Sequence, residues 1–171
     1  MRPTILLLAV SIWAVPAAVS QSVPSSLDKV AAYAGTWKTE IEHLDTKFSK
    51  AHKESIGIRN DCWSTEGYFA CHQFIDGKPS ALLVFTYNAK DDVYKSYVIP
   101  SDGGDVNTAK LLIKGNVWTF PWEDKDEAGK TYYFQVVNVW SGPNTIEYRR
   151  EFSEDKVHWT LAAKGHESKS P

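Results

Sequence analysis

The sequence predicts an all-β fold, a roughly ten-stranded antiparallel up-and-down barrel with a short N-terminal helix. Short runs of strand-type residues follow one another from residue 36 to residue 165, each separated from the next by a turn signal. Aromatic residues make up 13% of the chain, with seven tryptophans, which suits a β-rich interior or an aromatic binding surface. A closed barrel is favoured over a sandwich because closure leaves no unpaired sheet edge.

The N-terminal segment "MRPTILLLAVSIWAVPAAVSQS" is typical of a secretory signal peptide. One positive charge, Arg2, precedes an apolar run from Ile5 to Val15, and small residues lead to an expected cut after Ser20. The apolar run is too short to span a bilayer. We therefore predict residues 1–20 as a signal peptide and residues 21–171 as a single exported domain, periplasmic or extracellular.

The net charge of the chain argues against a nucleic-acid partner. Removal of Arg2 with the leader leaves 18 basic residues against 21 acidic ones, a net charge of −3. The chain has no run of Lys or Arg and no basic stripe, so nucleic-acid binding is not expected.

The segment "SSLDKVAAYAG" predicts the short helix. A serine cap begins it, Gly35 ends it, and one face would carry Leu27, Val30, Ala31 and Ala34.

The rest of the chain reads as strands and turns. Pro121 cannot donate to a ladder, so it should mark a seam or a strand end. The polar tail, residues 165–171, is expected to fray. The predicted strands lie near residues 36–42, 53–62, 68–75, 80–88, 93–99, 107–114, 116–122, 131–140, 144–152 and 157–165.

The only two cysteines lie in "DCWSTEGYFACHQF" and are predicted to form a disulfide. A tight turn at Glu66-Gly67 would pair the flanking strands so that Cys62 lies opposite Cys71, close enough to bridge. A metal site made of these cysteines and His72 is disfavoured, because neighbouring strand residues point to opposite faces. We expect no metal.

The same register places Asp61 opposite His72. Such a pair can orient an imidazole for acid/base chemistry. Opposite charges across strands are also common on protein surfaces, and the sequence favours this second interpretation.

The helix and "AGTWKTE" together resemble the Gly-x-Trp opening of lipocalin-like, or calycin, barrels, with Gly35 and Trp37 at the matching positions. "FIDGKPSALLVFTYNAKDDVYKSYVI" and "KGNVWTF" further resemble a bacterial family of exported calycin-like proteins of unknown function. The resemblance implies a barrel, a structural role for Gly35 and Trp37, and a late-strand arginine packed over the tryptophan. It implies no activity. Haem bound through a late histidine, His158 or His166, is disfavoured, and alternation puts the side chain of His158 outside.

Alternation within residues 144–152 sends Tyr148 and Arg150 inward among apolar neighbours. An inward arginine needs a partner. It either stacks on Trp37 and closes the barrel end, or holds a carboxylate or phosphate of a ligand.

Aromatic stripes on the strands are usually core, but they can also line a pocket. If a pocket exists, hydroxyl and amide groups on the same faces would be its polar contacts. The predicted ligand-binding residues are Arg150, Tyr148, Trp118, Phe120, Tyr87, Gln73 and Asn60.

These features predict an exported barrel that binds a small hydrophobic or amphipathic molecule, with no catalytic residue, metal or cofactor. The sequence contains no GxSxG, HExxH or P-loop motif. Two alternatives remain open: an enzyme of hydrolase or isomerase type on the same barrel, and a filled barrel with a structural or interaction role.

Overall fold

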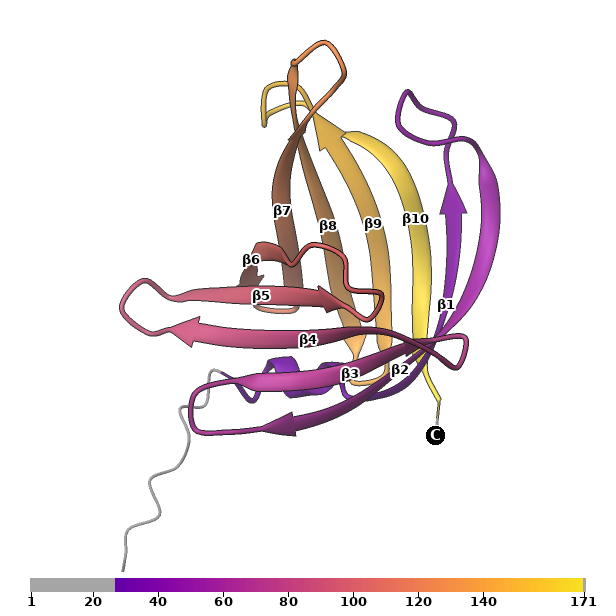
Figure 1. The fold of residues 1–171 in the computed structure, drawn as a ribbon. Coiled ribbons are helices and arrows are strands. Elements are labelled where there is room, and N and C mark those ends of the chain that lie inside the picture. Colours follow the sequence, from indigo (N-terminus) through magenta and orange to yellow (C-terminus); the bar gives the residue numbers. More distant parts are fainter. Residues whose placement is uncertain (1–26, 171) are drawn as a thin grey trace, which may run out of the picture.

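The computed structural model describes residues 27–170, which form one closed, ten-stranded antiparallel barrel (Figure 1). Each strand pairs with its neighbours in sequence, and the last strand pairs with the first. The predicted all-β up-and-down barrel is confirmed. The predicted signal peptide lies outside the described residues.

The strands match the predicted runs to within a few residues at most ends. The main difference is the last strand, which extends through the tail that was expected to fray. The elements are η1 (Val30–Tyr33), β1 (Gly35–His43), β2 (His52–Ser64), β3 (Phe69–Ile75), β4 (Lys78–Asn88), β5 (Val93–Pro100), β6 (Asn107–Lys114), β7 (Val117–Lys125), β8 (Thr131–Gly142), β9 (Thr145–Ser153) and β10 (Thr160–Lys169).

The predicted helix is a four-residue 3₁₀ turn, η1, at the lower end of the barrel in Figure 1. Its hydrogen bonds join residues three apart, such as Ala34 N–H to the Ala31 carbonyl at 3.0 Å. Leu27 and Val30 are buried in the core, while Ala31 is exposed. The segment therefore lacks the single apolar face predicted for it. The 3₁₀ turn is shorter and tighter than an α-helix, and it buries only the two larger side chains of that face, Leu27 and Val30.

The predicted register between β2 and β3 is confirmed. Cys62 lies directly opposite Cys71, and the two sulfur atoms form a disulfide. Pro121 lies within β7 opposite Gln135 of β8. The β6–β7 ladder stops at Thr119, so the missing N–H of Pro121 leaves no gap on that side, as expected of a seam.

The barrel closes where β1 meets β10. Trp37 pairs with Lys169 at one end of this ladder, and His43 pairs with Ala163 at the other. The strands approach so closely at Gly165 that a Cβ atom there would overlap the backbone of Glu40. The polar tail is thus a barrel strand, and its predicted fraying was wrong because its ladder bonds to β1 do not need apolar side chains.

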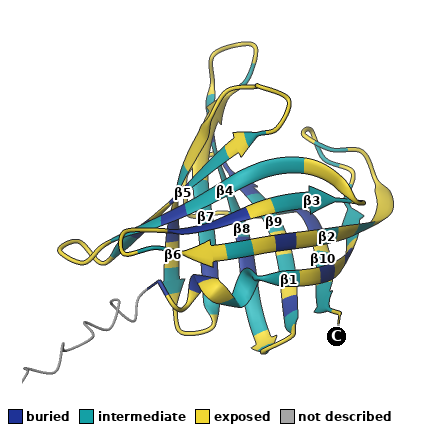
Figure 2. Cartoon of the chain, turned by 60° about the horizontal axis from the view of Figure 1, so that its bottom comes forward, coloured by how far each residue is buried: buried dark blue, intermediate teal, exposed yellow. Residues whose placement is uncertain are grey.

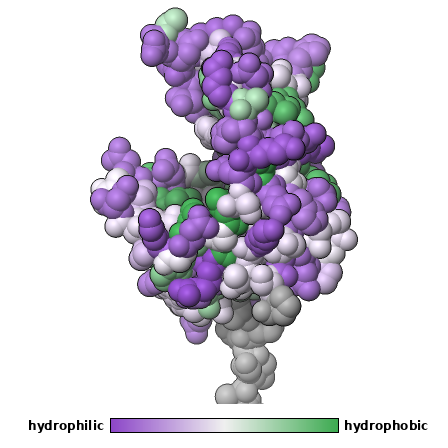
Figure 3. All heavy atoms as spheres, turned by 90° about the vertical axis from the view of Figure 1, so that its right-hand side faces the viewer, coloured by the Kyte–Doolittle hydropathy of each residue, from purple (hydrophilic) through white to green (hydrophobic). Residues whose placement is uncertain are grey.

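Buried residues, dark blue in Figure 2, lie within several strands of the barrel. In the view of Figure 3, hydrophilic side chains cover most of the surface. No helix within residues 27–170 combines the length and apolar character needed to cross a membrane. The main core cluster consists of Leu27, Val30, Phe69, Cys71, Phe85, Tyr94, Leu111 and Trp118.

Candidate functional site

A cavity of about 460 Å³ lies in the barrel interior between η1 and the strands. Alternation along each strand delivers its lining, because every second side chain points inward. Directly opposed pairs on neighbouring strands contribute to it: Trp37 with Ile58, Asn60 with Gln73, and Phe85 with Ser96. The lining residues are Tyr33, Trp37, Ile58, Asn60, Gln73, Leu83, Phe85, Ser96, Tyr97, Val98, Ala109, Phe120, Val136 and Glu167.

Gly35 and Trp37 fix the end of the cavity at which η1 lies. Gly35 adopts a φ of +108°, a backbone conformation that favours glycine, where η1 turns into β1. The buried indole of Trp37 donates a hydrogen bond to the carbonyl of Tyr33 at 3.0 Å. Asn60 donates to the same carbonyl at 3.1 Å, so the turn is held from two strands. The structural role that the Gly-x-Trp resemblance implies for Gly35 and Trp37 stays a prediction, with which these contacts are compatible.

Amide groups form one polar part of the cavity wall. The side-chain amide of Gln73 donates to the Asn60 side-chain oxygen at 3.4 Å, which orients both groups. Asn138 donates to the hydroxyl of Tyr33 at 2.7 Å. Burial, and the negative charge of nearby Glu167, raise the pKa of Tyr33 well above its usual range, so this hydroxyl stays protonated.

Glu167 is the one acidic residue of the lining. On β10 it lies between Thr39 of β1 and Ile146 of β9, both of which are buried, and this register directs its carboxyl inward. Burial raises its pKa to about 7, and the outer-face residue His166 opposes the shift. Among residues 27–170 no side chain or backbone group forms a hydrogen bond or ion pair with this carboxyl.

Of the predicted ligand-binding residues, Asn60, Gln73 and Phe120 line the cavity. Trp118 is instead packed in the core, with its ring 5.1 Å from that of Tyr33. The hydroxyl of Tyr87 donates to Asp92 at 2.8 Å, in the turn that follows β4.

Arg150 and Tyr148 point inward as predicted, but they lie outside the cavity lining. A guanidinium nitrogen of Arg150 lies 3.3 Å from Nδ1 of His43. The cation over the ring of Trp37 is Lys169, with its ammonium 5.3 Å from the ring centre. The expected stacking of Arg150 on Trp37 is wrong, because alternation determines the face of a residue and leaves its height along the barrel open.

The strand register gives the distance along the barrel between Arg150 and Trp37. Arg150 lies beside Ala163 of β10, whereas Trp37 lies beside Lys169. Six residues of extended strand separate these two positions, about 20 Å at roughly 3.3 Å per residue. Burial raises the pKa of Tyr148, which lies between them, and the positive charge of Arg150 opposes the shift.

A second polar cluster surrounds His43 at the far end of β1. Its Nε2 atom lies 2.7 Å from a carboxylate oxygen of Glu54, and its ring stacks on that of His52 at 4.1 Å. Ligand atoms of His43, His52 and Glu54 lie within 4.8 Å of one another, the one grouping of possible metal ligands within residues 27–170. Sequence reasoning did not find this grouping because the two histidines are separated in sequence. The pairing of β1 with β2 places them directly opposite each other.

The geometry around His43 is complete without a metal. Arg150 donates to Nδ1, so Nε2 carries the proton and donates to Glu54. A metal ion would have to displace one of these contacts beside a guanidinium charge.

Asp61 and His72 are directly opposed as predicted, on the outer face. Asp61 forms an ion pair with Arg59 at 3.3 Å, and the His72 ring packs edge-on against Trp63 at 5.1 Å. These separate partners match the surface interpretation of the pair.

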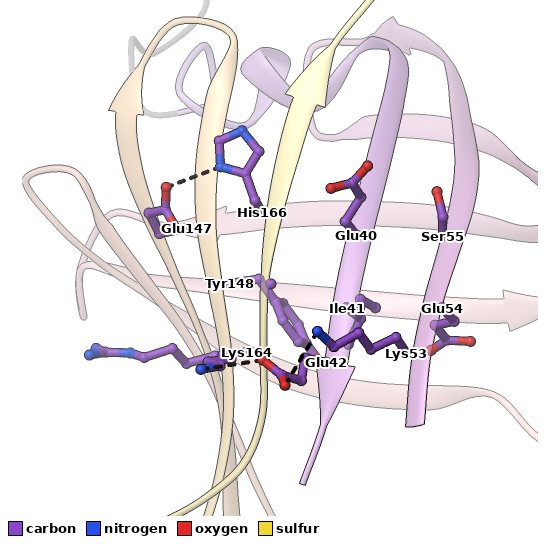
Figure 4. Close-up of a pocket in the computed structure, with 12 residues that line it drawn as sticks. Glu40, Ile41, Glu42, Lys53, Glu54, Ser55, Glu147, Tyr148, Lys164 and His166 are labelled. Carbon is purple, nitrogen blue, oxygen red and sulfur yellow. Dashed lines mark hydrogen bonds and ion pairs between the residues drawn. The ribbon is translucent and has the colours of Figure 1, made fainter. Parts of the chain in front are cut away.

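A larger hollow of about 730 Å³ lies on the outside, across β9, β10, β1 and β2 (Figure 4). Its charged groups have partners, and dashed lines in Figure 4 mark those that join Glu42 to Lys164 and Lys53 and His166 to Glu147. Glu42 forms ion pairs with Lys164 at 3.3 Å and with Lys53 at 3.7 Å, and His166 lies 3.0 Å from Glu147. These exposed, mutually paired charges describe a solvated face, so the smaller interior cavity is the candidate site.

Comparisons with known proteins leave the function to be argued from these residues. No family model matches the sequence, and no curated protein matches it. The fold is similar to the crystal structure of Rv2717c from M. tuberculosis, with a TM-score of 0.49 and 8% identity over 87% of this chain and 99% of that chain. The ten-stranded barrel fits a calycin-like architecture, while membership of the exported bacterial family stays a prediction.

Sequence reasoning missed Glu167, which lies in the tail that was expected to fray. The signal was present, since extending the alternation from Ala163 through Gly165 reaches Glu167 on the same face.

Proposed function

We propose that this protein is an exported barrel that binds a small hydrophobic or amphipathic molecule in its interior cavity. The cavity itself carries the proposal. Its volume of about 460 Å³ falls within the range of small-molecule sites, about 300–1,000 Å³.

The chemistry of the lining supports the same function. Apolar and aromatic side chains make up most of it, with a few polar groups held in place by the protein. The amide of Asn60 donates to the turn at η1 and accepts from the amide of Gln73, so both groups are oriented before a ligand arrives. A ligand with an apolar body and one polar end fits this distribution.

The Cys62–Cys71 disulfide supports export, because such bonds persist mainly in oxidising compartments. The signal-peptide pattern of residues 1–20 points the same way. The enzyme alternative has less support. The side chains of Arg150, His43 and Glu54, which contact one another in that order and could take part in acid/base chemistry, lie outside the cavity lining.

Native mass spectrometry of the mature protein, purified from its exported form, tests the proposal. Extra mass that leaves on unfolding is the expected result, followed by rebinding of an environment-sensitive apolar dye to the emptied barrel. A clean apo mass together with no dye binding would overturn the proposal.

Two variants of β8 locate the binding. Val136→Phe places a ring in the cavity lining, whereas Val139→Phe makes the same change on the opposite face of the same strand. We expect at least tenfold weaker dye binding for Val136→Phe and less than a twofold change for Val139→Phe. Equal binding by both variants would place the ligand elsewhere.

A further inference from the structure

The cavity contains a carboxyl group that no residue within 27–170 pairs with. Glu167 is directed inward by a register in which both flanking strands present buried residues, Thr39 and Ile146. No hydrogen bond or ion pair within residues 27–170 reaches its carboxyl. Glu167 is only partly exposed, and an ionised carboxylate removed from water without a partner is costly, so proteins ordinarily place a cation or hydrogen-bond donors beside it.

The cations nearest in the fold are engaged elsewhere. Lys169, the next inward residue of β10, donates to the carbonyl of Ala32 at 3.4 Å and lies over the ring of Trp37. Arg150 contacts His43. His166 lies on the outer face beside Glu147.

The uncharged groups near Glu167 do not replace a cation. Tyr33 on η1 and Tyr148 on β9 both lie within the electrostatic influence of the carboxyl, but they are neutral, and the Tyr33 hydroxyl accepts its hydrogen bond from Asn138. On β1 the neighbouring inward residues, Trp37 and Thr39, carry no charge. Within residues 27–170 no cation pairs with Glu167, so a ligand cation would be its first charged partner.

Aromatic faces complete the surroundings of this carboxyl. Tyr33, Trp37, Phe85 and Phe120 all line the same cavity. The face of an aromatic ring attracts an organic cation, and ammonium groups are recognised in proteins by such rings combined with a carboxylate.

We propose that the ligand of this cavity is an organic cation, an amphipathic amine whose ammonium group pairs with Glu167 while its apolar part packs against the aromatic lining. This inference rests on the proposed function, since it requires a ligand in the cavity. An anionic amphiphile is disfavoured because its charge would face that of Glu167.

Three eight-carbon compounds that differ only at the polar end test the proposal: octylamine, octanol and octanoate. Titration calorimetry of the mature, ligand-free protein at pH 8 compares their affinities. We expect octylamine to bind about tenfold to hundredfold more tightly than octanol, as a charge-assisted hydrogen bond provides, and octanoate to bind most weakly.

The matched variants are Glu167→Gln, which keeps the shape and removes the charge, and Glu123→Gln, an exposed strand residue on the outer face. Glu167→Gln should lose the preference for octylamine and keep octanol binding, while Glu123→Gln should behave as wild type. Retained octanol binding shows in the same experiment that the Gln variant is folded. Glu167→Asp should restore part of the preference.

The outcomes separate the two proposals. If none of the three compounds binds the wild-type protein, the binding cavity and the amine inference both fail. If octanol binds but octylamine has no advantage, or if the advantage survives in Glu167→Gln, the amine inference fails and the binding cavity stands.

Discussion

The charge state of Glu167 makes a sharp prediction about stability in the absence of ligand. Its pKa in the folded protein is raised by burial to about 7, above the ordinary value of 4.5. The folded protein therefore holds a proton on this carboxyl at pH values where the unfolded chain has released it. The stabilising contribution of that proton is present below about pH 4.5 and is lost as pH rises through about 7.

The Glu167→Gln substitution removes this dependence, because the amide is neutral at every pH. The interval between 4.5 and about 7, at about 1.4 kcal/mol per pH unit, gives an upper limit of about 3.5 kcal/mol. Since the carboxyl borders a cavity, contact with water lowers the expected gain to about 1–3 kcal/mol at pH 8. At pH 5 the gain should be below about 1 kcal/mol.

Urea denaturation followed by tryptophan fluorescence measures this difference at pH 5 and pH 8. Protein refolded from denaturant carries no captured ligand, and Glu123→Gln controls for the loss of one negative charge. An equal gain at both pH values would mean that packing, and not ionisation, is responsible. A Gln variant no more stable than wild type at pH 8 would show that the carboxylate already has a partner, which refutes the reasoning.

Three further predictions concern the frame around the site. Reduction of Cys62–Cys71, separated by 9 in sequence, should cost about 2–3 kcal/mol and lower the melting temperature by about 5–10 °C, and an unchanged melting curve would contradict the loop-closure argument. Gly165→Ala should lower the free energy of unfolding, measured by urea denaturation, by about 1–3 kcal/mol, because the new Cβ atom meets the backbone of β1. The control Gly142→Ala has open space around it and should change this free energy by less than about 1 kcal/mol. Equal losses in both variants would rule out the close approach at Gly165. Arg150→Ala should cost about 1–2 kcal/mol by leaving its histidine partner unpaired, and should change octylamine affinity less than twofold; loss of binding would place Arg150 in the site.

Local rules predicted most of the barrel. The turn at Glu66-Gly67 and the period of two between side chains were enough to give the Cys62–Cys71 register, and through it the inward placement of Asn60. Hairpins are local structures, so their turns and their alternation are written in adjacent residues. The ten strands and their order follow from repeating this reasoning along the chain.

The features that the sequence did not predict depend on how strands that are distant in sequence pair with one another. The last strand contains Gly165, His166 and Glu167, whose polarity resembles a loose end, and only pairing with β1 makes it a strand. The height of Arg150 in the barrel depends on the stagger accumulated across all the strands, which no single hairpin reveals. The candidate site was therefore predicted in part, through Asn60, Gln73 and Phe120, and its charged residue was missed.

The pairing of β10 with β1 also governs the order of events when the protein is made. β1 is among the first segments to leave the ribosome, and its partner strand is synthesised after all nine others. Until then β1 and β9 each present an open edge, which invites pairing with other chains. Because β10, which carries Glu167, is synthesised after the other strands, the cavity can bind a ligand only after β10 has paired with β1. A chain that is kept unfolded until β10 has been synthesised avoids exposing the open edges of β1 and β9.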